Sequence, residues 1–455
     1  MIAGKPVDRR LIKGGLLALL IVAEILLGSL VAMRPEDSHL ILGVAIGLIA
    51  VVVTFIEPVF GLYLLIAAMF AENLLRLGAI STARLIVILT FGAWIAHSLS
   101  RKQFEIIVPL QGWLAIAFVV WGLLSALWSI DTQKLFSALQ TLIQSIGLYF
   151  LVVNLVSSFK KMQVVITITI LASLALSSLA FSHIIAGGAT GRIDITQVFG
   201  TGPHALAGYL VPGAAVLLIM SSREVQVMRK LFLLSGLLAT VLAILATGTR
   251  AAVVALAVIA IVGLMMDRKL WQVVLPSVLV SGWGALFLLP PAFVERLESI
   301  LAASDRGAGR LDIWLVALNI IRSHPILGTG LDTFGRSFDR YVADTPALET
   351  TYVVQGWGSH NMFLNIQAEL GIIGLALFVS IVGMSVKDGL MAILNLKRAG
   401  DYPMITLVLG TWLGLMGMLV VCLFLDWQYT KYLWLLFALA EVARRLSTGT
   451  DEEKG

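Results

Sequence analysis

Long apolar runs recur along almost the whole chain and leave little room for a water-soluble core. Of the 455 residues, 59% are hydrophobic and 13% are charged, whereas soluble proteins are about 25% charged. Runs of about 17 to 25 apolar residues are long enough to cross the hydrocarbon core of a bilayer as helices. The sequence predicts an all-α polytopic membrane protein with about 14 transmembrane helices, or 12 if closely spaced runs are merged.

The first apolar run, the cysteine count and the net charge argue against a cleaved signal peptide, a disulfide framework and binding to nucleic acid. The first apolar run, residues 11–33, is too long for the apolar region of a signal peptide, so we predict a retained span. The single cysteine, Cys422, allows no intramolecular disulfide framework. The net charge of +5 comes without a basic arm or block, which argues against binding to nucleic acid.

The basic residues predict the orientation in the membrane. With the N-terminus inside, nineteen lysines and arginines fall in the cytoplasmic segments. Six fall in the short loops on the opposite side: Arg34, Arg76, Lys134, Arg192, Arg250 and Lys431. Because basic residues collect on the cytoplasmic side, both termini are predicted to be cytoplasmic and residues 291–359 to lie outside.

This outer segment divides the chain. It is too short for an independent enzyme domain with a large core, so we expect it to work with the membrane helices. An amphipathic helix is predicted over residues 310–322, with an apolar stripe at Leu311, Trp314, Leu315, Leu318 and Ile321. The predicted parts are an N-terminal transmembrane bundle (1–290), the outer loop (291–359), C-terminal transmembrane helices (360–446) and a cytoplasmic tail (447–455).

Three arginines are candidates for binding an anion on the outer side. Arg250 follows Thr247-Gly248-Thr249 at the end of a span, Arg310 opens the amphipathic helix, and Arg192 lies in another outer loop. A guanidinium offers a rigid fork of donors that suits phosphate oxygens. The alternatives are an arginine that reaches ordinary lipid headgroups, for Arg250, and a solvated or lipid-facing role for the other two.

A histidine stands where the outer loop ends and the next span begins. Ser359 is the expected N-cap of that helix, and His360 is expected in its first turn. Asn361, Asn365 and Glu369 follow on one face and are expected to support it. A helix N-terminus keeps an imidazole neutral and able to accept a proton, although many such histidines are packing residues. The sequence has no His-Glu-x-x-His motif and no cysteine cluster, so it predicts no metal site.

Several short motifs occur in order in the second half of the chain. They are Phe199–Gly208, Thr247–Ala252, Gly309–Trp314 with Ser323–Gly330, and Ser359–Asn361 running on to Glu369–Gly374. In these motifs the chain resembles the O-antigen ligase and polymerase superfamily of bacterial envelope glycosyltransferases, and it is most similar to an O-antigen ligase. The resemblance covers roughly residues 190–380. One departure is His204, which stands where the family more often has asparagine.

The resemblance implies a function. A family member of this kind transfers a glycan from undecaprenyl diphosphate to a sugar hydroxyl of lipid A core, on the periplasmic face of the bacterial inner membrane, and thereby completes lipopolysaccharide. The reaction is implied to be inverting and independent of metals and other cofactors. The family's catalytic histidine maps onto His360, and its arginines map onto Arg250, Arg310 and, with a poorer match, Arg192.

Other functions stay open at this point. An O-antigen polymerase or a protein O-oligosaccharyltransferase would use the same donor and differ only in the acceptor. A transporter of lipid-linked oligosaccharides is the alternative from another class. The chain shows no inverted internal repeat and no matched pair of broken helices, and a transporter gives no reason for the long outer loop.

Overall fold

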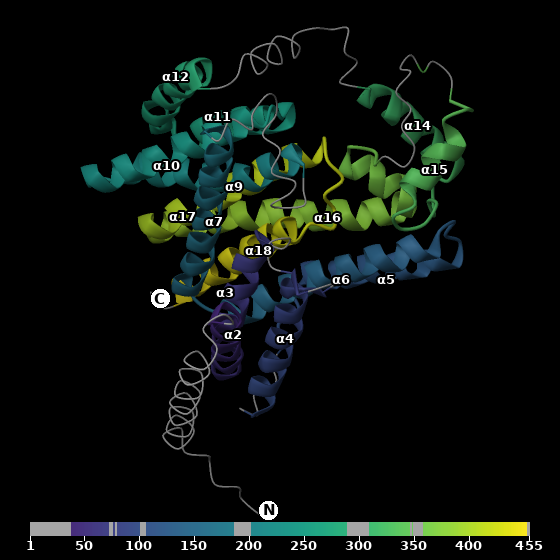
Figure 1. Ribbon diagram of the computed structural model, residues 1–455, viewed down its shortest axis with the longest axis horizontal. Coiled ribbons are helices and arrows are strands. Elements are labelled where there is room, and N and C mark those ends of the chain that lie inside the picture. The colour runs from purple at the N-terminus through teal and green to yellow at the C-terminus, as the bar shows by residue number, and fades with distance from the viewer. Residues whose placement is uncertain are drawn as a thin grey trace, which may run out of the picture. The chain divides into compact units, whose positions relative to one another are not determined.

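The computed structural model describes residues 38–71, 76–77, 80–100, 106–185, 202–288, 309–345, 348 and 358–452. The predicted first span, 11–33, and Arg192 lie outside these residues. Within them the chain is helical (Figure 1), apart from a hairpin of two short antiparallel strands, β1 (Arg76–Leu77) and β2 (Ile80–Ser81). The predicted all-α fold class is confirmed.

Eight of the described helices are long and apolar enough to cross a membrane. They are α4 (Thr82–Ser100), α5 (Leu110–Leu124, extended by the 3-10 helix η2, Ser125–Leu127), α6 (Thr132–Leu155), α7 (Phe159–Ile185), α9 (Pro203–Arg223), α10 (Val227–Ala246), α16 (Met362–Ala399) and α17 (Tyr402–Cys422). This agrees with a polytopic membrane protein. The predicted number of 14 or 12 spans stays a prediction.

The structure describes eight further helices. They are α2 (Ser38–Ile56), α3 (Pro58–Met69), α11 (Arg250–Met266), the 3-10 helix η3 (Arg268–Leu270), α12 (Trp271–Leu288), α14 (Arg310–Ser323), α15 (Phe334–Tyr341) and α18 (Lys431–Glu452). The first unit of the chain combines residues 1–64 with 85–105, and the second combines 65–84 with 106–455. In the first, the side chains of Thr54 and Thr90 are buried against Gly61, which brings α2, α3 and α4 together.

The second unit is built around α9 and α17, which lie side by side (Figure 1). Small residues allow this approach, since a Cβ on Gly414 would lie 3.0 Å from Pro212 Cα. Membrane helices use such contacts because lipid provides no hydrophobic drive for association. Helix α18 packs against both α6 and α16.

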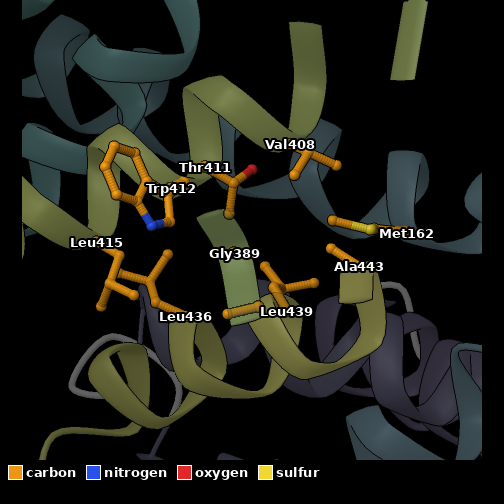
Figure 2. A pocket seen from close by; sticks show the side chains of 10 residues that line it. Met162, Gly389, Val408, Thr411, Trp412, Leu415, Leu436, Leu439 and Ala443 are labelled. Atoms are coloured by element: carbon orange, nitrogen blue, oxygen red, sulfur yellow. The ribbon is translucent and has the colours of Figure 1, made fainter. Parts of the chain in front are cut away.

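A small apolar cavity remains where α16, α17 and α18 meet (Figure 2). Trp412 of α17 lies beside Gly389 of α16 and donates a hydrogen bond from Nε1 to the carbonyl of Val386, 2.9 Å away. The residues that line the cavity include no titratable side chain. It is part of the packed core and offers no chemistry.

Helices α14 and α15 pack onto the first turns of α16 and share a core with them. The buried side chains are Ile313, Val316, Ala317, Ile320, Ile321, Phe334, Phe338 and Ala368. The predicted helix is present, and of its predicted apolar stripe Ile321 is buried here while Leu311 and Leu318 are exposed. Helix α14 has apolar residues on more than one side, and contact with α15 and α16 decides which of them are buried.

Helix α16 is interrupted near its start. Gly371 has φ 65° and ψ −167°, a backbone region that is almost restricted to glycine. The break frees carbonyl groups of the preceding turn: Ala368 O accepts from Thr329 N at 3.0 Å, and Glu369 O accepts from Gly330 N at 2.8 Å. The loop after α14 is therefore bonded directly to the break in α16.

The connection from α5 to α6 holds the same loop from its other side (Figure 1). Leu331 N donates to Ser125 Oγ at 3.1 Å, and Arg336 forms a 3.0 Å ion pair with Asp131. Arg336 is largely exposed, so the ion pair contributes little to stability. The buried hydrogen bond and the glycine-dependent break fix the position of α14 and α15.

Replacing Gly371 should destabilise this junction. In Gly371→Ala the new Cβ would overlap the carbonyl of Ile326, and the backbone conformation disfavours any side chain. We expect a loss of about 1–3 kcal/mol, measured as a lower midpoint of thermal unfolding in detergent. Gly383→Ala is the matched control, since it lies in the same helix with open space at its Cβ. An equal midpoint for both variants would contradict the prediction.

Candidate functional site

The starts of several helices carry the residues singled out from the sequence. Arg250 is the first residue of α11, Arg310 is the first residue of α14, and His360 lies two residues before α16. The partial positive charge of a helix N-terminus adds to the charge of each arginine. The described part of the candidate site is thus rich in positive charge and in N–H donors.

A carboxylate that the sequence analysis did not select holds the turn before α16. Asp426, in the connection from α17 to α18, accepts from His360 N at 3.1 Å through Oδ2. Its Oδ1 accepts from Asn361 N at 3.0 Å and lies 2.7 Å from Ser359 Oγ. One carboxylate thereby accepts charge-assisted hydrogen bonds from two backbone N–H groups and one hydroxyl group of this turn.

The start of α16 differs from the predicted one. Asn361 is the N-cap, and its Oδ1 accepts from the backbone N–H groups of Phe363 and Leu364 at 3.0 and 3.1 Å. Ser359 was predicted for that role, but its hydroxyl faces Asp426. His360 therefore stands in the turn rather than in the helix.

The backbone of His360 is in the left-handed region, with φ 51°. Non-glycine residues seldom adopt this conformation, and it persists where the surroundings enforce it. Gly358 allows the carboxylate to approach, because a Cβ at that position would overlap Asp426. The imidazole is thus set by a strained turn and a close backbone contact.

One contact positions the Arg310 side chain, and a second positions the helix that carries it. Its guanidinium carbon lies 5.5 Å from the centroid of the Phe424 ring, a cation–π distance. One turn later in the same helix, Trp314 Nε1 donates to the carbonyl of Ser359 at 3.1 Å. Helix α14 is therefore attached to the turn that carries His360.

The charges of these residues influence one another. Burial lowers the pKa of His360 below its usual value, Asp426 acts in the opposite direction, and Arg310 lowers it further. Burial also lowers the pKa of Arg310, with a smaller lowering from Arg250. Arg250 thus acts on Arg310 and Arg310 on His360, and the lowered pKa favours the neutral form of His360.

His204, the departure from the family pattern, lies beside Thr249 in the structure. Its Nδ1 is 3.3 Å from Oγ1 of Thr249, the residue before Arg250. Thr249 is in turn 2.9 Å from the hydroxyl of Thr247. The start of α9 is therefore bonded to the turn from α10 to α11.

The remaining predicted supporting residues lie in the first turns of α16. Glu369 is buried, and its oxygens accept from Phe334 N at 3.2 Å and from Tyr429 Oη at 3.0 Å. Asn365 is also buried, and its Oδ1 has no hydrogen-bond partner among the described residues. Glu369 thus links α15 and α16 to the segment between α17 and α18. Arg192 is outside the residues that the structure describes.

Asp426 gave one signal in the sequence that was overlooked. It is the only acidic residue between residues 402 and 440, within the predicted C-terminal transmembrane helices. A lone carboxylate beside cationic groups at the end of a membrane span is costly unless it is paired. In the described residues, no group of three or more His, Cys, Asp or Glu is placed to hold a metal ion.

The comparison with protein families gives one match. Residues 234–379 match the family model described as O-antigen ligase. The match covers about a third of the chain and includes Arg250, Arg310 and His360, while Asp426 and His204 lie outside it. It supports the O-antigen ligase superfamily for this chain and confirms the resemblance seen in the motifs. No curated protein matches the chain.

Removal of the Asp426 carboxylate should loosen the turn that carries His360. Hydrogen bonds to a charged group contribute about 1.5–3 kcal/mol each, so in Asp426→Ala we expect hydrogen exchange of a peptide covering 358–364 to accelerate at least about tenfold. Asp426→Asn should lie between, since an amide keeps one acceptor oxygen. Hydrogen–deuterium exchange with mass spectrometry measures this.

A second aspartate provides the control for this experiment. Asp401 caps α17 by accepting from Met404 N at 3.2 Å. Asp401→Ala removes a capping carboxylate elsewhere in the chain and should leave exchange at 358–364 unchanged. Exchange at 358–364 that is the same in the Asp426 and Asp401 variants would show that the carboxylate does not hold the turn.

Proposed function

We propose that this protein is an O-antigen ligase, which transfers a glycan from undecaprenyl diphosphate to a sugar hydroxyl of lipid A core. The observation that carries the proposal is the gathering of Arg250, Arg310 and the neutral His360 within the segment that matches O-antigen ligases. The reaction is an inverting single displacement that uses no metal ion and no other cofactor. Its products are completed lipopolysaccharide and undecaprenyl diphosphate.

In this proposal Arg250 and Arg310 bind the diphosphate of the donor. Each guanidinium matches two phosphate oxygens, and the N-termini of α11 and α14 add donors and partial positive charge. The two arginines repel each other, as the pKa of Arg310 reflects. An anion between them offsets that repulsion and is stabilised most when the leaving diphosphate gains charge.

His360 accepts the proton of the acceptor hydroxyl. The hydroxyl oxygen forms a bond to the anomeric carbon of the donor sugar as the bond from that carbon to the diphosphate oxygen breaks. The electron pair of the broken bond leaves with the diphosphate, and the proton moves to the imidazole. A base of this kind must be neutral, which agrees with the lowered pKa of His360.

The proposal includes a place in the cell. Multiple apolar helices and the family match agree with a membrane enzyme. We assign it to the bacterial inner membrane, with both termini in the cytoplasm and the site facing the periplasm, where the donor and lipid A core meet. In this arrangement the segment of residues 291–359 lies in the periplasm, between the transmembrane helices of residues 1–290 and those of residues 360–446. Residues 447–455 form a cytoplasmic tail.

Loss of the imidazole should nearly abolish transfer. A general base contributes about 10²–10⁴-fold, so we expect a rate loss of that size in His360→Asn. Asparagine tolerates the left-handed backbone at this position, so the turn should be kept. The measurement is transfer of glycan from undecaprenyl diphosphate to lipid A core by the purified protein in detergent.

Two further readouts make this test specific. His324→Asn replaces an exposed histidine near Tyr341 and should keep wild-type activity.

The wild-type rate should fall in acid only below about pH 6.5, because the neutral form of a histidine with a lowered pKa persists below the usual value. Wild-type transfer by His360→Asn would refute the role of the base, and a product on a second lipid-linked glycan or on protein would refute the ligase assignment.

A lysine should not replace Arg250. The ammonium group keeps the charge but cannot make two parallel bonds to phosphate, so we expect Arg250→Lys to lose at least about tenfold in kcat/KM for the donor, or ~1.4 kcal/mol. Arg268→Lys, an exposed position in η3, is the control and should keep full activity. Equal activity of the two variants would argue against bidentate binding of the diphosphate.

A further inference from the structure

A second cavity lies beside the connection from α17 to α18, away from the small apolar one. It has a volume of about 210 Å³, many times the roughly 10–15 Å³ that holds one water molecule on this measure. We call this space the tyrosine cavity. It is lined by Met69, Thr141, Tyr209, Tyr429, Thr430, Lys431 and Tyr432. The cavity therefore has room for a ligand much larger than one water molecule.

The lining combines aromatic rings with hydrogen-bonding groups. Three tyrosines provide flat apolar surfaces, while Thr141, Thr430 and Lys431 provide hydroxyl and ammonium groups. A sugar ring has apolar C–H faces surrounded by hydroxyl groups, so it can satisfy both kinds of surface.

The aromatic walls are fixed before any ligand binds. Tyr209 is stacked on Tyr432, with ring centroids 5.8 Å apart and an angle of 16°, and it also contacts Trp427 at 5.4 Å. Tyr429 donates from its hydroxyl to Glu369 at 3.0 Å, and its carbonyl accepts from Ser145 Oγ at 2.6 Å. A preorganised wall avoids much of the entropy cost of binding.

The cavity is close to the candidate reaction centre along the chain. Tyr429 is three residues after Asp426, which holds the turn of His360, so their Cα atoms are at most about 11 Å apart. We propose that the tyrosine cavity binds one sugar unit of the donor glycan or of the acceptor core, one or two units from the bond that is formed. This inference rests on the proposed function, because it assigns a subsite to the same glycan transfer.

Filling the cavity tests the proposal. Thr141 projects from α6, and its hydroxyl bonds only to the Ser137 carbonyl of the same helix among the described residues, at 3.2 Å. Thr141→Phe therefore fills the space without breaking a bond between helices. Gln140→Phe adds the same ring at an exposed neighbouring position and is the control. Thr141→Val, which exchanges the hydroxyl for a methyl group of similar size, replaces the phenylalanine variant if that protein does not fold.

Transfer kinetics give the first result. We expect Thr141→Phe to raise one KM about tenfold, in the range found for the loss of a pocket contact, and Thr141→Val to raise it severalfold. A raised KM for the lipid-linked donor assigns the cavity to the donor glycan, and a raised KM for lipid A core assigns it to the acceptor. Kinetics equal to those of Gln140→Phe would overturn the proposal.

A binding measurement separates this inference from the proposed function. Saturation-transfer NMR with glucose, galactose and N-acetylglucosamine at millimolar concentration needs no turnover. Sugar signals from wild type and Gln140→Phe that vanish in Thr141→Phe would support the subsite even if the wild-type protein transferred no glycan to lipid A core. A wild-type protein with neither transfer nor sugar signals would overturn both proposals.

Discussion

The Asp426 carboxylate is the interaction on which the candidate site depends. An ionised carboxylate only accepts hydrogen bonds, and this one accepts from successive backbone N–H groups of the turn before α16. Those groups belong to a turn whose histidine has an unfavourable backbone conformation. The same negative charge lies near Arg310 and His360 and moderates the effect of burial on both. One side chain thus fixes the geometry and adjusts the charge of the site.

The break in α16 has a related role at the scale of helices. It separates the first turns of α16, which follow Asn361 and carry Asn365 and Glu369, from the rest of the helix. The carbonyl groups freed at the break accept hydrogen bonds from the loop after α14. Because α14 also carries Arg310, the arginine and the histidine are connected through backbone hydrogen bonds as well as through Trp314. Such a connection limits their relative movement, which transfer chemistry requires of groups that must be aligned.

The sequence was sufficient for the fold class because a bilayer demands long apolar runs, and such runs are visible without knowledge of their partners. It also indicated Arg250, Arg310 and His360, since each stands where an apolar run or an amphipathic pattern begins. Residues whose role depends on distant partners were missed. Asp426 acts on a turn 66 residues earlier in the chain, and the break at Gly371 depends on a loop that precedes it.

Local signals also failed where several residues compete for one role. Both Ser359 and Asn361 are good N-caps, and the choice between them was made by Asp426, which engages the serine. The buried face of α14 was likewise set by its neighbours. The local sequence was compatible with more than one detail of these elements, and tertiary contacts decided between them.

The position of Asp426 near the end of the chain has a consequence for biosynthesis. Arg250, Arg310 and His360 are made first, and the turn has no acceptor for its N–H groups until residue 426 has been synthesised and α17 has packed against α9. The candidate site therefore takes its final form only after the connection from α17 to α18 has been made. A nascent chain that has not yet reached residue 426 therefore carries Arg250, Arg310 and His360 without the carboxylate that holds the turn.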